Sequence, residues 1–233
     1  MQELNLNKFK VLDLKKEQWI DWQLAEVIFV VDYSGSMSNL YSNWTVQKVL
    51  ERLFPIAMAF DDNQSMDFIL FQNNYKVCPN VTLSNIDWYV KNIALKQNYD
   101  MWGTSYSPVL KDIILPKIVE KSWFFWLTKN IKKLDNPVYV IFLTDWECSD
   151  KSDTYNVVKE LANGWVFIQF IWIGNDNFST LQWLDDMSWR LLDNADFFPI
   201  QKIDSISNEQ LYWKMMTEFP AWIKQAKVKN LIY

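Results

Sequence analysis

Residues 27–36 read Val27-Ile28-Phe29-Val30-Val31-Asp32-Tyr33-Ser34-Gly35-Ser36, an unbroken apolar run that ends at an acidic residue. A continuous run rich in β-branched residues is typical of a strand that is covered on both faces, as in a parallel sheet. We therefore expect a buried strand at 27–31 that leads directly into a polar loop.

Similar apolar runs recur along the chain and alternate with helical patterns. Further strands are expected at 65–71, 79–83, 138–143, 165–173 and 195–200. Helices are expected at 45–60, 84–97, 107–120, 152–163, 177–184 and 208–227, with a kink or early end at Pro55 and with Ser107 as an N-cap. Alternating strands and helices indicate right-handed βαβ units.

The expected fold class is therefore α/β, with a doubly wound, mostly parallel central sheet and helices on both faces. A chain of 233 residues is long enough for one domain with a large core. We expect the domain to span residues 26–227. Residues 1–25 are expected to form a lead-in packed on the domain, and residues 228–233 a C-terminal tail.

The composition excludes several classes of function. The net charge is −5, which argues against a nucleic-acid partner. The sequence contains no histidine, so Ser-His-Asp triads, Cys-His pairs and His-ligated zinc sites are excluded. The two cysteines, Cys78 and Cys148, are expected to be reduced thiols of a cytoplasmic protein. No apolar run is long enough to cross a membrane, and the N-terminus does not resemble a signal peptide.

Oxygen-bearing side chains follow two of the expected strands and precede one expected helix. Asp32, Ser34 and Ser36 follow the first strand, Thr104 precedes the helix at 107, and Asp145 follows strand 138–143. In a doubly wound sheet, the loops at the carboxyl ends of the strands converge on a crevice at the switch point. If the strands that end at Asp32 and Asp145 are neighbours, all five side chains meet there.

This set of oxygen donors suits a hard divalent cation. Mg²⁺ prefers oxygen ligands in a near-octahedral shell and keeps several waters; Mn²⁺ or Ca²⁺ would also fit. Two carboxylates balance one divalent charge, so the ion can accept one more anionic ligand, such as the Asp or Glu of a protein partner. The alternative interpretation is ordinary turn and cap chemistry, in which Asp and Ser are common.

A weaker pattern combines Asp61-Asp62-Asn63 with Asp67. It could suggest a second, calcium-type site, but its spacing does not match an EF-hand loop. We expect a solvated turn between a helix and a strand instead.

The five residues resemble the metal-ion-dependent adhesion site (MIDAS) of von Willebrand factor A (VWA) domains. That family carries Asp-x-Ser-x-Ser, matched by Asp32, Ser34 and Ser36, and a later Thr and Asp, matched by Thr104 and Asp145. The resemblance covers about residues 10–225. It is strongest to VWA proteins of bacterial tellurium-resistance and chemical-stress systems, through the segments 11–16, 45–52, 60–62 and 193–198.

The resemblance implies a metal-dependent protein-binding module of a stress system, without enzymatic activity. Two other functions remain open. One is a metal-dependent phosphohydrolase, in which the ion polarises a phosphate. The other is a structural VWA module whose site binds nothing.

The aromatic composition is unusual, because the chain has 14 tryptophans and 4 glycines. Average usage predicts about 16 glycines at this length. Tryptophan occupies positions where the similar proteins often carry glycine, namely Trp44, Trp88, Trp102, Trp146, Trp172 and Trp189. One hypothesis is a gene from a lineage that reads UGA as glycine. The other is a genuine aromatic rim around the site.

Overall fold

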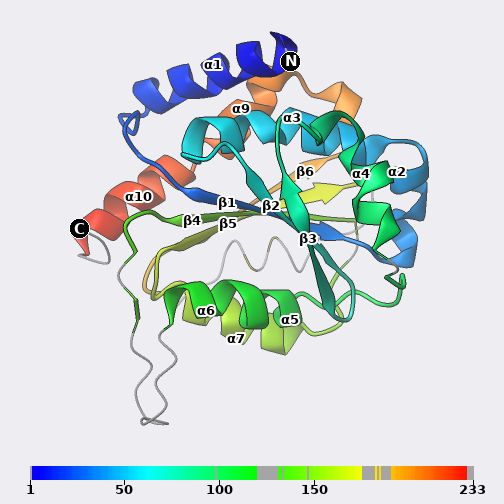
Figure 1. The fold of residues 1–233 in the computed structure, drawn as a ribbon. Coiled ribbons are helices and arrows are strands. Elements are labelled where there is room, and N and C mark those ends of the chain that lie inside the picture. Colours follow the sequence, from blue (N-terminus) through cyan, green and yellow to red (C-terminus); the bar gives the residue numbers. More distant parts are fainter. Residues whose placement is uncertain are drawn as a thin grey trace.

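Six strands form one central sheet in the order β3-β2-β1-β4-β5-β6 (Figure 1). The strands are β1 (Glu26–Asp32), β2 (Met66–Phe71), β3 (Tyr75–Val81), β4 (Val138–Thr144), β5 (Val166–Ile173) and β6 (Ala195–Ile200). All neighbouring pairs are parallel except β2 and β3, which are antiparallel. The computed structural model describes residues 2–97, 99–119, 131–132, 134–145, 147–174, 182, 184 and 190–229. The predicted α/β fold with a mostly parallel sheet is confirmed.

Helices cover both faces of this sheet. In Figure 1, α1 (Gln2–Glu17), α3 (Thr45–Phe60), α9 (Asn208–Met215) and α10 (Phe219–Val228) lie above it. Below it lie α5 (Ser107–Val109), α6 (Leu115–Ile118) and α7 (Lys151–Leu161). Two short helices, α2 (Ser38–Ser42) and α4 (Tyr89–Asn92), lie near one end of the upper layer.

The central strands bury both of their faces, as their apolar runs predict. In β1, Phe29 and Val31 belong to the core under the upper helices, whereas Ile28 and Val30 belong to the core of the lower layer. All residues of β4 and β5 are buried. The alternation of side chains between two apolar layers explains why these strands lack a polar face.

Several expected helices differ from the structure. The helix expected at 84–97 is only α4 flanked by two 3₁₀ turns, and the one expected at 208–227 is divided into α9 and α10, with Pro220 in the first turn of α10. The helix expected at 107–120 contains a π-helical turn, Leu110–Ile114. Pro55 lies inside α3 without shortening it.

The strand expected at 79–83 begins earlier, at Tyr75. Most of the helix expected at 177–184 lies outside the described residues.

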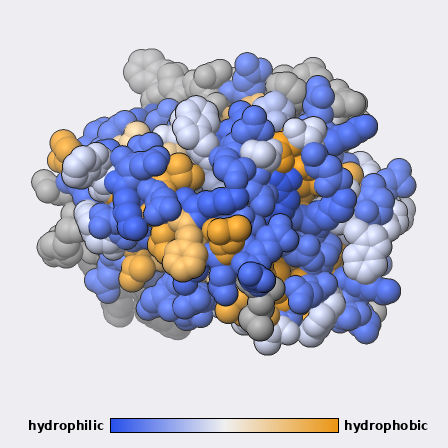
Figure 2. All heavy atoms as spheres, turned by 90° about the horizontal axis from the view of Figure 1, so that it is seen from above, coloured by the Kyte–Doolittle hydropathy of each residue, from blue (hydrophilic) through white to orange (hydrophobic). Residues whose placement is uncertain are grey.

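The N-terminal segment forms α1, which packs against α3. The Lys15 ammonium is buried between them and donates hydrogen bonds to the Gln23 and Ala59 carbonyls at 2.7 and 2.9 Å. It also lies 4.2 Å from the Phe60 ring centroid. Burial lowers the pKa of Lys15 to about 8. The opposite side of α1 exposes the apolar side chains of Leu6 and Phe9. Figure 2 views the molecule from the side of the upper helices and shows patches of hydrophobic residues on a mostly hydrophilic surface.

Cys78 and Cys148 are free thiols, and both are buried. Among the residues that the structure describes, no helix combines the length and the hydropathy that a bilayer crossing requires.

Candidate metal centre

The site is built where β1 and β4 end side by side. These strands are parallel neighbours, with Val31 paired to Leu143. Asp32 is the last residue of β1, and Asp145 follows the last residue of β4. The two predicted carboxylates therefore lie on adjacent strand ends at the switch point of the sheet, as the sequence analysis required.

A continuous chain of hydrogen bonds joins four of the five predicted residues. The Ser34 amide donates to Asp32 Oδ1 at 2.7 Å, and the Ser34 and Ser36 hydroxyls lie 2.9 Å apart. The Ser36 hydroxyl donates to Asp145 Oδ1 at 2.7 Å. Asp32, Ser34, Ser36 and Asp145 thus present their oxygens to one small region.

The fifth residue, Thr104, lies on a loop that contacts both the loop after β1 and the loop after β4. Its carbonyl accepts hydrogen bonds from the Ser149 amide and hydroxyl at 2.8 and 3.0 Å, which ties it to the loop after β4. On the other side, the loop approaches Gly35 closely: a Cβ atom added to Gly35 would lie 3.8 Å from the Met101 carbonyl oxygen. Thr104 is buried, and no hydrogen bond among the described residues joins its side chain to the other four predicted residues.

Three residues that the sequence analysis missed hold Asp32 in place. The Thr144 hydroxyl donates to Asp32 Oδ2 at 2.7 Å and accepts from the Tyr106 hydroxyl at 3.3 Å. The Tyr41 hydroxyl donates to the Asp32 carbonyl at 2.8 Å. Thr144 immediately precedes a predicted ligand, which is the one local signal that could have indicated its role.

Asp150 connects the loop after β4 to the loop of Thr104. Its carboxylate accepts the backbone N–H groups of Tyr106 and Ser107 at 3.0 and 2.8 Å, and the Thr154 hydroxyl at 3.2 Å. The prediction that Ser107 caps its own helix is wrong, because Tyr106 occupies the N-cap position. The Asp150 carboxylate, from a distant segment, instead accepts hydrogen bonds from the amides at the start of this helix.

The site contains one fully buried carboxylate, that of Asp32. Burial raises the pKa of Asp32 to about 7, against the opposing effect of the hydrogen bonds from Ser34 and Thr144, and nearby Asp145 adds to the rise. No ion pair to Asp32 is found in the described part of the chain. A buried negative charge without a cation is unfavourable, so a bound positive ion would stabilise it.

The donors fit a hard cation better than a soft one. Two carboxylates and three hydroxyls are all oxygen ligands, which Mg²⁺, Mn²⁺ and Ca²⁺ accept. No group of three or more Cys, Asp or Glu residues with metal-binding geometry occurs among the described residues, so hydroxyls would have to supply part of the shell. Trp146, which follows Asp145, lies outside the described residues.

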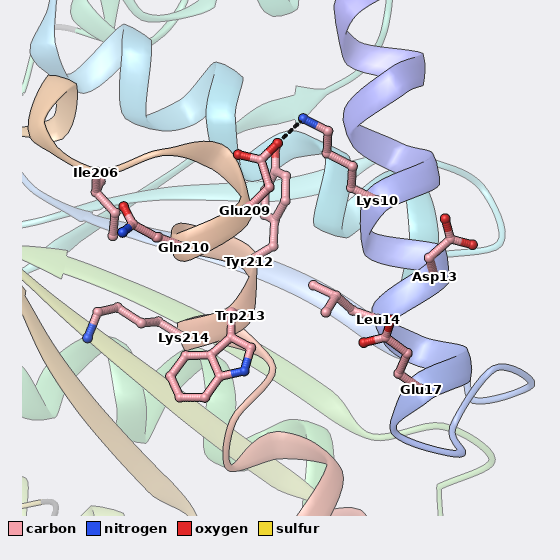
Figure 3. Close-up of a pocket in the computed structure, with 10 residues that line it drawn as sticks. All are labelled: Lys10, Asp13, Leu14, Glu17, Ile206, Glu209, Gln210, Tyr212, Trp213 and Lys214. Atoms are coloured by element: carbon pink, nitrogen blue, oxygen red, sulfur yellow. Dashed lines mark hydrogen bonds and ion pairs between the residues drawn. The ribbon is translucent and has the colours of Figure 1, made fainter.

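A cavity of about 780 Å³ lies elsewhere, between α1 and α9 (Figure 3). Leu14 and Trp213 give it apolar walls, and Lys10 forms an ion pair with Glu209 across it (Figure 3). None of the five predicted site residues lines this cavity.

Comparisons with known proteins show the family and the fold. Residues 24–232 match the model of the vWA-TerF-like family, described as the vWA found in the TerF C terminus. The chain belongs to this family. A relative in Bacillus subtilis (strain 168), the protein YcbR, is 31% identical over 234 residues, which cover 100% of this chain and 91% of YcbR. The resemblance inferred from the sequence is therefore confirmed.

Solved VWA structures share the fold at low sequence identity. Proximal thread matrix protein 1 from the mussel byssus has a TM-score of 0.57 and 15% identity, over 83% of this chain and 46% of that protein. The same protein with a zinc-occupied MIDAS motif has a TM-score of 0.56 and 15% identity, over 84% and 48%. The SpRpn10 VWA domain has a TM-score of 0.51 and 13% identity, over 81% and 93%. The chain thus spans about half the length of the mussel protein.

Proposed function

We propose that this vWA domain is a metal-ion-dependent protein-binding module. Ser34, Ser36 and Thr104 would bind Mg²⁺ through their hydroxyls, and Asp32 and Asp145 would bind it directly or through water. Mn²⁺ and Ca²⁺ are the other candidate ions. The observation that carries the proposal is the hydrogen-bond chain from Asp32 through Ser34 and Ser36 to Asp145, which brings four of the five proposed ligands together.

The bound ion would supply a positive centre with one coordination position open to a carboxylate. The protein's residues determine the rest. Thr144 orients the Asp32 carboxylate, and Asp150 fixes the Thr104 loop beside it. Because only two ligands are charged, the ion would remain attractive to a third anion. We therefore propose a protein partner that presents an Asp or Glu side chain.

We place this module in a bacterial tellurium-resistance or chemical-stress system in the cytoplasm. The family description, which names TerF, supports the system. Two free cysteines support a reducing compartment. The net charge of −5 gives no support to a nucleic-acid partner.

Partner capture with and without a chelator tests the proposal. The protein would be immobilised and exposed to native lysate in Mg²⁺ or in EDTA, beside the variants Ser36→Ala and, as a control at the opposite end of the sheet, Asp61→Asn. We expect a protein that is retained in Mg²⁺, lost in EDTA and lost with Ser36→Ala, but kept with Asp61→Asn. Capture that is unchanged by EDTA would refute the proposal.

The same samples distinguish the two alternative functions. Mg²⁺-dependent phosphatase turnover that Asp32→Asn abolishes would instead favour a hydrolase. A melting temperature that no divalent ion raises would favour a structural module, because a ligand that binds only the folded state must stabilise it.

A further inference from the structure

Three residues other than glycine have a positive φ in the described part of the chain: Trp19 at 61°, Trp44 at 67° and Gln64 at 52°. The left-handed region is unfavourable for residues with a Cβ, and Gly, Asn and Asp are the residues that adopt it most readily. Two of the three positions nevertheless carry tryptophan, which accounts for only 14 of the 233 residues.

Trp19 occupies the position after a helix at which glycine is most strongly preferred. The Trp19 amide donates to the Lys16 carbonyl, and the Ile20 amide donates to the Lys15 carbonyl, at 3.0 and 2.9 Å. This pair of bonds is the Schellman motif that ends α1, with residue 19 as the left-handed C′ residue. Trp19 is 80% exposed, so little packing compensates for the unfavourable φ.

Trp44 occupies the equivalent position between α2 and α3. Its amide donates to the Tyr41 carbonyl at 3.3 Å, which ends α2, and its carbonyl accepts from the Lys48 amide at 3.0 Å, which begins α3. The residue must turn the chain between two helices with φ at 67° and ψ at 10°. Trp44 is half-exposed, and among the described residues its ring contacts the Lys91 ammonium, at 5.4 Å from the centroid.

We infer that glycine, and not tryptophan, occupies positions 19 and 44 in the protein as its source organism makes it. The codon that accounts for both positions is UGA, read as glycine by that organism and translated here as tryptophan. The excess of 14 tryptophans over 4 glycines agrees with such a code. Backbone geometry supports the inference at these two positions independently of composition.

The rival hypothesis of an aromatic rim does not explain both positions. Trp19 ends α1, whereas the candidate metal centre lies at the ends of β1 and β4. Trp88, Trp102 and Trp172 do not have positive φ, so their backbone conformation does not favour glycine. The inference is therefore confined to positions 19 and 44. Trp146 and Trp189 lie outside the described residues.

Coding DNA and peptide mass spectrometry test the inference directly. We expect UGA codons at positions 19 and 44, and native peptides from the source cells whose masses contain glycine at both positions. UGG codons, or peptides that contain tryptophan there, would overturn it. Reading both the gene and the protein excludes a code in which UGA specifies tryptophan.

Stability measurements test the backbone argument separately. Trp19→Gly and Trp19→Ala remove the same indole but differ in their tolerance of positive φ, so we expect the glycine variant to melt about 2–4 °C higher. Trp213 is the matched control, because it is also exposed (59%) but lies inside α9. There the order should reverse, since glycine disfavours a helix. A Trp19→Ala variant as stable as Trp19→Gly would contradict the argument.

Discussion

Two groups of carboxylates lie at opposite ends of β1, and they differ in their burial and in the groups that contact them. At the amino end, Glu26, Asp61 and Asp67 line a common pocket, which we call the amino-end cluster. Lys117 pairs with Glu26 and lies 3.8 Å from Asp67, and the Asn63 amide donates to Asp61 at 3.1 Å. The predicted turn at 61–63 is present.

At the carboxyl end, hydroxyls contact both acids: Thr144 donates to Asp32, and Ser36 donates to Asp145. Asp32 is fully buried, whereas Glu26 and Asp67 are partly exposed to water. The comparison teaches that a cluster of acids alone does not identify a metal site. The informative feature is a buried acid, Asp32, that hydroxyls orient and that forms no ion pair with the residues the structure describes.

The largest expected effect is the loss of Mg²⁺ affinity when a carboxylate is removed at the carboxyl end. Asp145→Ala should weaken Mg²⁺ binding by about 100-fold or more, because it removes both a donor and half of the balancing charge. Asp61→Ala, in the amino-end cluster, should leave the affinity unchanged. Calorimetric titration of both variants measures this; equal losses would remove the distinction between the two ends.

The pH dependence of Mg²⁺ binding should come from Asp32. Its pKa is about 7 in the folded protein, above the ordinary 3.8, so the metal-free fold is most stable with Asp32 protonated and loses that contribution as the pH rises through 7. Mg²⁺ requires the carboxylate, so its apparent affinity should be about 30-fold weaker at pH 5.5 than well above pH 7.

Thermal melting with and without Mg²⁺ checks this sign. The rise in melting temperature caused by Mg²⁺ should be larger at pH 8 than at pH 5.5, and Asp32→Asn should remove the difference. The same rise at both pH values would mean that Asp32 does not compete for the ion.

A smaller effect is expected from the residue that orients Asp32. Thr144→Val keeps the shape of the side chain but removes the hydrogen bond to Asp32, and should weaken Mg²⁺ binding by about tenfold. Thr144→Ser keeps the hydroxyl and should restore most of the affinity. Thr217→Val, two residues beyond α9, is the control and should bind as the unsubstituted protein does. A Thr144→Val variant with full affinity would show that this hydrogen bond is not needed.

The smallest effect is expected at the amino end. Lys117→Met leaves Glu26 and Asp67 without their cation and should lower the free energy of unfolding by about 0.5–1 kcal/mol, as for other partly exposed ion pairs. Urea denaturation measures the change. Mg²⁺ affinity should be unaffected, and a substantial loss would show that the two ends are coupled.

Much of this arrangement could be predicted from local sequence. The apolar runs of β1, β4 and β5 indicated buried parallel strands, and strands of that kind place Asp32 and Asp145 at one edge. The neighbouring positions of Asp32 and Asp145 followed from that topology. Their position was predictable because the carboxyl ends of parallel strands share one side of the sheet.

The supporting contacts could not be predicted in the same way. Thr144 and Asp32 are 112 positions apart in sequence, and Asp150 caps amides 43 and 44 positions away. Such hydrogen bonds depend on the tertiary fold and leave no periodic pattern. The wrong assignment of Ser107 as an N-cap has the same cause, since local capping rules do not anticipate a carboxylate from another loop.

The central claim is that the oxygens after β1 and β4 hold one divalent ion, and calorimetric titration of the unsubstituted protein with Mg²⁺ tests it most directly, with Asp32→Asn as the matched variant. We predict saturable binding of one ion per chain at pH 8 and none with Asp32→Asn. Absence of binding to the unsubstituted protein, or identical binding by Asp32→Asn, would contradict the account.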